Sequence, residues 1–170
     1  VSYRSDMARL VFGELDGSMS ERAQRFKAAC EGAGFDVELS GNITATLWQK
    51  FVLLATNAAL TTITRQPAAV VYGDPELKAL AADLMREVMA VAAAQDIRLP
   101  DDVLERSIAL TDSFPPDMYA SMYHDLAAGK PLEVASFSGL IARLGAELGV
   151  PTPHHRTIYA CLKPYEHGAA

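Results

Sequence analysis

Residues 43–64 read ITATLWQKFVLLATNAALTTIT, and Lys50 is the only ionisable residue among them. This long apolar stretch predicts a helix from about Ile43 to Arg65. At helical spacing Lys50 lies on one polar edge, and the other faces carry large apolar side chains. We therefore expect a helix that is buried nearly all round. Its polar edge comprises Thr46, Lys50, Asn57, Thr61 and Thr64.

The same stretch does not have the character of a membrane span, because Lys50, Asn57 and several threonines dilute its apolar residues. A lysine at the centre of a span costs roughly 2.5 to 3.5 kcal/mol on insertion scales. The first residues, Val1–Arg4, also lack the charged and apolar segments of a signal peptide. We expect no membrane association and a cytoplasmic protein, and the missing initiator Met hints at a trimmed chain.

The composition favours one domain with a hydrophobic core, since the chain has 170 residues and 50% of them are apolar. The formal net charge is -6, and no cluster of Lys and Arg is longer than two residues, which argues against a nucleic-acid partner. Cys30 and Cys161 lie outside any C-x-x-C spacing. We expect two packed thiols in a reducing compartment rather than a disulfide or a zinc site.

Short strands are predicted only in the first part of the chain. Val1–Leu15 alternates weakly and ends in a glycine turn, and Phe35–Leu39 has the pattern of a second short strand. Between them, Ser18 and Glu21 have the spacing of a capping box, which predicts a helix that Gly34 ends.

The remaining residues predict helices separated by clear breaks. Asp74-Pro75-Glu76 combines an N-cap, a proline at the first helical position and a first-turn acid. Further helices are expected after Leu99, around Met118–Leu126, up to Gly149 and after Pro153. The fold class that we predict is all-α: a single helical domain of about six helices with a short β segment at the N-terminus.

Three residues are chemically isolated. Lys50 is a lone ammonium among apolar residues, Glu133 is the only charge between Pro131 and Ala142, and Ser121 lies on the helix before that segment. A desolvated lysine readily serves as a proton donor. The alternatives are a lysine that extends to solvent, a first-turn acid that complements a helix dipole, and a solvated serine. The residues alone leave both interpretations open.

His154 and His155 are adjacent rather than one helical turn apart, so the sequence predicts no metal site there, and capping or surface roles suit them better. Gly139, Gly145 and Gly149 follow no predicted strand and do not form a phosphate-binding loop. They indicate close helix packing or a helix end.

Several blocks taken together resemble one family. They are Leu47-Trp-Gln-Lys-Phe51, Ser121-Met-Tyr-His-Asp-Leu126, Gly129-Lys-Pro-Leu-Glu133, Gly139 and Gly149-Val-Pro-Thr-Pro153. In order and spacing they are similar to the C-terminal domain of ketopantoate reductase, and the resemblance spans essentially the whole chain. Phe12–Gly17 resembles the segment that leads into that domain.

The resemblance implies the helical domain of a two-domain oxidoreductase, similar to the C-terminal domain of 6-phosphogluconate dehydrogenase. Residues 1–17 would be the tail of an absent N-terminal Rossmann domain or a linker, and residues 18–170 the substrate and catalytic domain. The absent domain would bind NADPH. Because the chain has no G-x-G-x-x-G after a strand, we expect no cofactor site in it and no activity of the chain alone.

The resemblance also implies roles for individual residues. Lys50 falls on the family's catalytic lysine, Glu133 on its active-site glutamate, and Ser121 on its serine that contacts the substrate carboxylate. Reduction of a 2-keto acid to a 2-hydroxy acid builds negative charge on the carbonyl oxygen, which an ammonium stabilises and protonates. The activity implied is that of an NADPH-dependent 2-dehydropantoate 2-reductase. With ketopantoate as substrate, it would serve pantothenate and coenzyme A biosynthesis.

Three positions depart from the family's pattern, and one of them is Ala135, where an acid commonly follows the glutamate by two residues. Better-known members carry asparagines four and eight residues after the lysine, where this chain has Leu54 and Ala58. Asn57, which we include among the candidate substrate-binding residues, lies about 100° around the helix from position 58. Hydroxyl recognition depends on buried polar partners, so the identity of the keto acid stays open, as does the preference for NADPH over NADH.

Two other interpretations stay open. In one, the chain is a non-catalytic helical module for dimerisation or partner binding, and Lys50 and Glu133 form a satisfied ion pair. In the other, it is a related dehydrogenase domain that acts on another keto acid. Apolar helices such as Leu77–Val91 could pair in a homodimer, although core packing explains them equally well.

Overall fold

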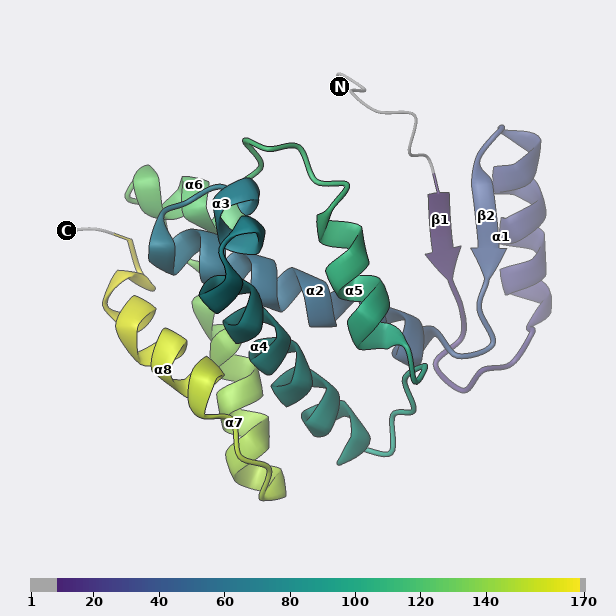
Figure 1. The fold of residues 1–170 in the computed structure, drawn as a ribbon. Helices are drawn as coiled ribbons and strands as arrows, with labels where there is room; N and C mark the ends of the chain where they lie inside the picture. Colours follow the sequence, from purple (N-terminus) through teal and green to yellow (C-terminus); the bar gives the residue numbers. More distant parts are fainter. Residues whose placement is uncertain (1–8, 169–170) are drawn as a thin grey trace. The chain divides into compact units, whose positions relative to one another are not determined.

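Residues 9–168 are described by the computed structural model of the protein, shown in Figure 1. The chain forms two compact units, and the boundary between them, after Leu47, falls inside one long helix. The first unit is built on a β-α-β motif, and the second consists of helices and the turns between them. The predicted fold class, mainly helical with a short β segment near the N-terminus, is confirmed.

The first unit contains two short strands and one helix. Strand β1 (Arg9–Phe12) pairs in parallel with strand β2 (Asp36–Leu39), in register from Arg9 opposite Asp36 to Phe12 opposite Leu39. Helix α1 (Glu21–Gly32) forms the crossover that parallel neighbours need. Both strands agree with the predicted segments, except that residues 1–8 of the first prediction lie outside the described residues.

Helix α1 begins later than the capping box predicts. Its N-cap is Ser20, whose side chain accepts a hydrogen bond from the Ala23 backbone N–H at 3.2 Å. The backbone N–H of Ser18 donates instead to the Asp16 carboxylate at 2.9 Å. The prediction chose the wrong serine because the Asp16 side chain holds Ser18 in the preceding turn.

The second unit continues from within α2. Asp74 caps α4 as predicted, since its carboxylate accepts from the backbone N–H groups of Glu76 and Leu77, both at 2.9 Å. Gly149 ends α7 in the left-handed conformation, with φ of 71°. Helix α3 was not predicted, because so short a segment has no clear periodicity. The elements are α2 (Ile43–Thr64), α3 (Ala68–Gly73), α4 (Pro75–Ala93), α5 (Val103–Thr111), α6 (Ser121–Ala127), η1 (Glu133–Ala135), α7 (Ser138–Leu148), α8 (Pro153–Leu162) and η2 (Lys163–Tyr165), where η marks a 3₁₀ turn.

Helix α2 contributes to the core of the second unit on two sides. One cluster of buried side chains joins its last turns to α3, α4, α6 and α8 and includes Leu60 and Met122. A second cluster joins its middle to α4 and α7 and includes Val52, Met85 and Ile141. In Figure 1, α4 crosses in front of α2, in agreement with their shared core. The position of α2 is therefore fixed by packing against several helices.

One edge of α2 is exposed, contrary to the prediction of burial nearly all round. Leu47 is 56% exposed and Leu54 is 41% exposed, and Lys50 between them is also exposed. Val52 and Ala55, by contrast, are completely buried. The prediction was wrong for this edge because its leucines have no covering helix among the described residues.

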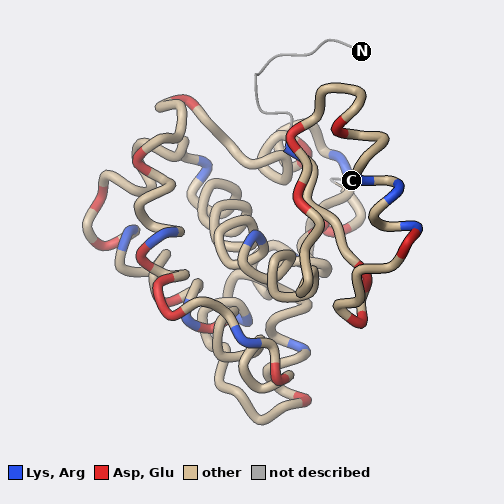
Figure 2. Tube along the Cα trace, turned by 90° about the vertical axis from the view of Figure 1, so that its right-hand side faces the viewer, with Lys and Arg blue, Asp and Glu red and all other residues tan. Residues whose placement is uncertain are grey.

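Three smaller expectations can be compared with the structure. No helix within residues 9–168 is long and apolar enough to cross a membrane. Acidic and basic residues are interspersed along the trace in Figure 2, without a run of basic residues in the part that is coloured. Cys30 is half-buried but Cys161 is exposed, so the expectation of two packed thiols is wrong for Cys161.

A buried carboxylate fixes the start of α8. Glu87 of α4 is 7% exposed, and its two oxygens accept hydrogen bonds from the backbone N–H groups of His154 at 2.8 Å and His155 at 2.9 Å. A helix start leaves such N–H groups without partners, and a negative charge there complements the helix dipole. The Nδ1 atom of His154 also lies 2.7 Å from the same carboxylate. Glu87 therefore caps a helix distant in sequence.

His155 lies in the core, so the surface role predicted for it is wrong. It is 0% exposed, its Nδ1 atom lies 3.2 Å from the Ser138 hydroxyl, and its Nε2 atom lies 3.2 Å from the Leu84 carbonyl oxygen. Burial lowers the pKa of His155 to about 4, against the opposing attraction of Glu87. The ring thus links α4, α7 and α8 in its neutral form.

Replacing Glu87 by Ala should lower the free energy of unfolding by about 2 kcal/mol, because two helix-start N–H groups lose a charged acceptor. Chemical denaturation measures this loss. The matched control is Glu147→Ala, since Glu147 pairs with Arg143 at 3.1 Å on the exposed surface of α7. The control should change stability by less than about 0.5 kcal/mol. Equal losses in the two variants would contradict the capping role.

Stability should also fall as the pH is lowered from 6.5 toward 4. The unfolded chain protonates His155 near the ordinary pKa of 6.5, whereas burial lowers the pKa to about 4 in the folded state. The unfolded state therefore binds more protons in this window and becomes more favourable. A denaturation series across these pH values should show a smaller slope for His155→Gln, and an identical slope would refute the assignment.

Candidate active site

Lys50 lies on the exposed edge of α2. Within the described residues no carboxylate oxygen is within 4.0 Å of its ammonium, so it forms no ion pair there. Of the two interpretations left open for Lys50, a desolvated ammonium and a side chain that extends to solvent, its exposure agrees with the second. Its ammonium is open to an anion from outside the unit.

Aromatic rings hold the turn of α2 that carries Lys50. Phe51 stacks on Phe137, with ring centroids 5.9 Å apart and planes at 17°, and Trp48 meets Phe51 edge-on at 5.9 Å. Both are favoured arrangements of aromatic pairs. Because Phe137 follows the turn that carries Glu133, this stack ties the Lys50 turn to the Glu133 segment.

Glu133 begins the turn η1 and does not belong to the first turn of α7, where it was predicted. Its neighbours Leu132 and Val134 are 5% and 0% exposed, whereas Glu133 itself is exposed. Its carbonyl oxygen accepts hydrogen bonds from the backbone N–H groups of Ser136 at 2.9 Å and Phe137 at 3.2 Å. The backbone is thus anchored in the core while the carboxylate is accessible.

Ser121 is the first residue of α6 and is exposed. The backbone N–H of Ala120, just before it, donates to Thr61 Oγ1 at 3.3 Å, and the Thr61 hydroxyl donates to the Asn57 carbonyl at 2.7 Å. Met122, just after it, is 1% exposed in the core. These contacts hold the start of α6 against α2.

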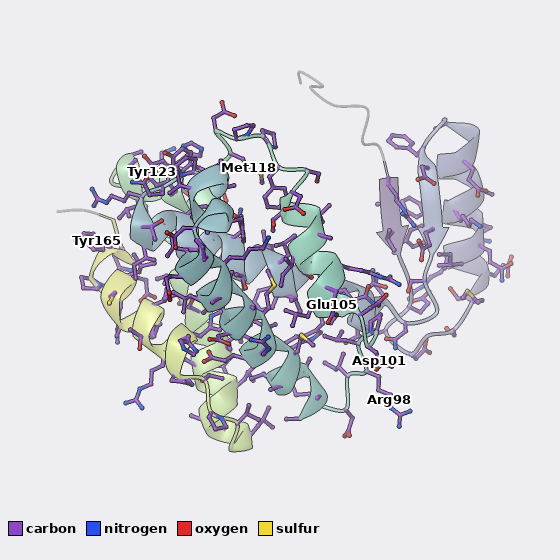
Figure 3. All side chains as sticks on the ribbon, in the orientation of Figure 1. Arg98, Asp101, Glu105, Met118, Tyr123 and Tyr165 are labelled. Carbon is purple, nitrogen blue, oxygen red and sulfur yellow. The ribbon has the colours of Figure 1, made fainter. Side chains whose placement is uncertain are left out.

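The sequence analysis missed an aromatic group whose members lie on both sides of Ser121 in sequence. Tyr119 and Tyr123 stack with ring centroids 4.0 Å apart, and His124 meets both rings edge-on. Figure 3 shows Tyr123 on α6 and Met118 on the segment that leads to it. The signal was present in the sequence, since each tyrosine is two residues from Ser121.

Asn57 is 5% exposed, and its Oδ1 atom accepts a hydrogen bond from the Tyr72 hydroxyl at 3.3 Å. Burial raises the pKa of Tyr72 well above its usual value, so the phenol keeps the proton that it donates. Among the described residues, none bonds to the side-chain nitrogen of Asn57. That nitrogen is therefore not used by the contact that holds the Asn57 side chain.

The structure anchors three exposed candidates on elements of one unit. Ser121 and Glu133 are each tied to α2, the helix of Lys50, through the contacts described above. In the described part of the chain, no hydrogen bond or ion pair joins any two of the three side chains. The satisfied ion pair expected for a non-catalytic module is therefore not formed. A cation, a hydroxyl and a carboxylate are instead presented separately.

A hollow of about 460 Å³ lies elsewhere in the unit, between the end of α4 and the loop before α5. Met89, Leu99 and Asp101 are among the residues that line it, and Figure 3 labels Arg98 and Asp101 at this place. None of the candidate residues contributes to its wall. The candidate residues therefore lie outside this hollow.

Residues 42–166 match the family described as "Ketopantoate reductase PanE/ApbA C terminal". The chain belongs to this family. The 2-dehydropantoate 2-reductase of Mycobacterium tuberculosis is 33% identical over 131 residues, which cover 77% of this chain and 44% of that protein. The chain spans about half the length of the curated relatives it matches.

Solved structures of the ketopantoate reductase family share the fold. The family member from Ralstonia eutropha JMP134 superposes with a TM-score of 0.83 at 32% identity, over 94% of this chain and 51% of that one. A D-mandelate dehydrogenase solved with NADH and anilino(oxo)acetate gives a TM-score of 0.81 at 24% identity, over 93% and 52%. The second similarity concerns the fold alone, and the substrate is not fixed by these relationships.

Thr61→Val should lower the free energy of unfolding by about 1 to 2 kcal/mol, because the Ala120 N–H loses its acceptor. Hydrogen exchange at the Ala120 amide should accelerate as well. Thr157→Val is the matched control: Thr157 also donates to the carbonyl four residues before it, at 2.8 Å, but on an exposed surface. Comparable losses in both variants would show that Thr61 does not link α2 to α6.

Proposed function

We propose that this chain is the substrate-side part of an NADPH-dependent 2-keto acid reductase of the 2-dehydropantoate 2-reductase type. The observation that carries the proposal is the Lys50 ammonium, exposed on a firmly packed helix and without a carboxylate partner in residues 9–168. Membership in the ketopantoate reductase family and the similarity to the Mycobacterium tuberculosis enzyme support it.

In this proposal the cofactor is held by another part of the enzyme. The chain has no G-x-G-x-x-G stretch after a strand, so its own residues do not fit the pyrophosphate of a dinucleotide. The relatives are about twice the length of this chain, and in this proposal the part that the chain does not cover includes a Rossmann domain. When bound there, the nicotinamide supplies the hydride, and the chain alone is inactive.

Lys50 stabilises charge and delivers the proton. As the 2-keto carbon accepts hydride, negative charge grows on the carbonyl oxygen, where the Nζ–H groups stabilise it. One proton passes from Nζ to that oxygen, which yields the 2-hydroxy acid and a neutral amine. Because the side chain is exposed, water can return the proton after turnover. An ammonium that forms no ion pair within residues 9–168 is available to bind the carbonyl oxygen of the substrate.

The other candidates bind and orient. The Ser121 hydroxyl donates a hydrogen bond to the substrate carboxylate, and Glu133 orients Lys50 or a substrate hydroxyl. The side-chain nitrogen of Asn57 donates a hydrogen bond to the substrate. The backbones of these residues are anchored in the core, so little conformational freedom is lost when a ligand binds.

The substrate in this proposal is a small 2-keto acid in the cytoplasm. If it is ketopantoate, the product enters pantothenate and coenzyme A biosynthesis. The fold shared with D-mandelate dehydrogenase favours a second candidate, the reduction of a different 2-keto acid. Both candidates use Lys50 in the same way.

In the full-length enzyme, Lys50→Met should lower kcat by at least about 100-fold, because proton donation and oxyanion stabilisation are both lost. Stability should hardly change, since the side chain is exposed. Lys78→Met is the matched control, because Lys78 contacts Asp112 at 4.0 Å on the surface and has no role in the mechanism. A near-normal kcat for Lys50→Met would overturn the assignment of Lys50 as the proton donor.

A further inference from the structure

Leu54 is a large apolar side chain at the candidate site that the mechanism above does not use. It is 41% exposed, whereas Ala55, next to it, is completely buried. It follows Lys50 by four residues, which places it about 6 Å further along α2 and about 40° around it. A ligand that contacts the Lys50 ammonium therefore lies beside Leu54 as well.

Polar groups are scarce where α2 continues from Leu54. Ala58, one turn later, is 2% exposed and has no polar side-chain atom. Asn57 is 5% exposed, and its oxygen is already bonded to Tyr72. Its side-chain nitrogen, about 20° around the helix from Lys50, is assigned in the proposed function to the polar head of the ligand. A hydroxyl on the substrate side chain that lies against this turn meets methyl groups where it needs a hydrogen-bond partner.

We propose that Leu54 makes this site selective for 2-keto acids with an apolar, branched side chain over those with a side-chain hydroxyl. The inference rests on the proposed function, because it takes Lys50 as the point at which the keto group binds. The Lys50 ammonium selects the anionic keto acid group of the ligand. Apolar contact with Leu54 selects the side chain of the ligand. In this form of the mechanism Glu133 orients Lys50 rather than a substrate hydroxyl.

The physical reason is the difference in desolvation between the two side chains. A hydroxyl that loses its water against Leu54 without a new partner is unfavourable, whereas an apolar group of the same shape gains from contact with leucine. A hydrophobic site discriminates only moderately against an added hydroxyl, by up to about 100-fold, because it rejects nothing by shape. The expected selectivity is therefore a preference and not an exclusion.

The test uses two substrates that differ by one hydroxyl. In 3,3-dimethyl-2-oxobutanoate the carbon next to the keto group carries three methyl groups, and in ketopantoate one of these is a hydroxymethyl group. We measure kcat/KM for both with the full-length enzyme, with NADPH and in parallel with NADH. The apolar acid should be preferred by about 10- to 100-fold.

Two variants assign the preference to Leu54. Leu54→Asn places a polar amide at the same position and should reduce the preference ratio by at least about tenfold, because the hydroxyl gains a partner. Leu54→Met keeps the apolar surface and should leave the ratio within about threefold of the parent value. Since Leu54 is partly exposed, both variants should fold, which circular dichroism and thermal unfolding verify.

The outcomes separate this inference from the proposed function. If the unmodified enzyme prefers ketopantoate, or if Leu54→Asn leaves the ratio unchanged, the role of Leu54 is overturned while the reductase function stands. If the enzyme reduces neither acid and no other 2-keto acid, the proposed function fails and the inference fails with it.

Discussion

The burial of α2 on two sides is the constraint on which the rest of the second unit depends. Val52 and Leu60 are both fully buried, each in a different cluster, so the helix has one rotational setting in which both are covered. A rotation by one residue, about 100°, would expose one of these clusters and turn Lys50 toward the core. Burying an unpaired ammonium is strongly unfavourable, so apolar packing and charge exclusion act in the same direction. The direction of Lys50 is thus a consequence of the core.

Buried polar groups in this unit join helices to one another. Thr61 links α2 to α6, Glu87 links α4 to α8, and His155 contacts atoms of α4 and α7 from its place on α8. Each makes hydrogen bonds that replace those lost to water, which is required of a polar group in a core. Among the described residues, the Thr62 hydroxyl is a buried group without such a partner. The other side-chain polar atoms that are completely buried in residues 9–168 are paired, whereas the candidate catalytic groups are exposed and unpaired.

Interactions within a few residues were sufficient to predict most of the helices and strands. The burial of individual side chains depends on contacts between distant segments, which the sequence did not predict. Asp74 and Gly149 mark helix ends through bonds to their own neighbouring backbone, so the sequence is sufficient to place them. His155 and Leu54 were misjudged because the burial of each depends on helices far away in sequence. Lys50 is a candidate because it is the only ionisable residue of α2 and because of the family resemblance, and its catalytic role stays a prediction. Its exposure did not follow from periodicity, because an apolar edge of a helix has the same sequence pattern whether it packs against the core or against a binding partner.

The exposure of Lys50 alters how the proposed chemistry is organised. An ammonium in water interacts weakly with an anion, whereas the same pair in a medium of low dielectric interacts several times more strongly. Apolar side chains near the candidate residues can provide a medium of low dielectric. Leu54 lies beside Lys50 on α2, and the stacked Tyr119 and Tyr123 flank Ser121 in sequence. In the proposed enzyme these apolar surfaces are covered when substrate and the nucleotide domain bind, and water is displaced from around the single positive charge. An exposed leucine beside an unpaired lysine is unfavourable as a free surface. In the proposed enzyme this part of α2 forms one side of the site, and the substrate and the nucleotide domain form the other.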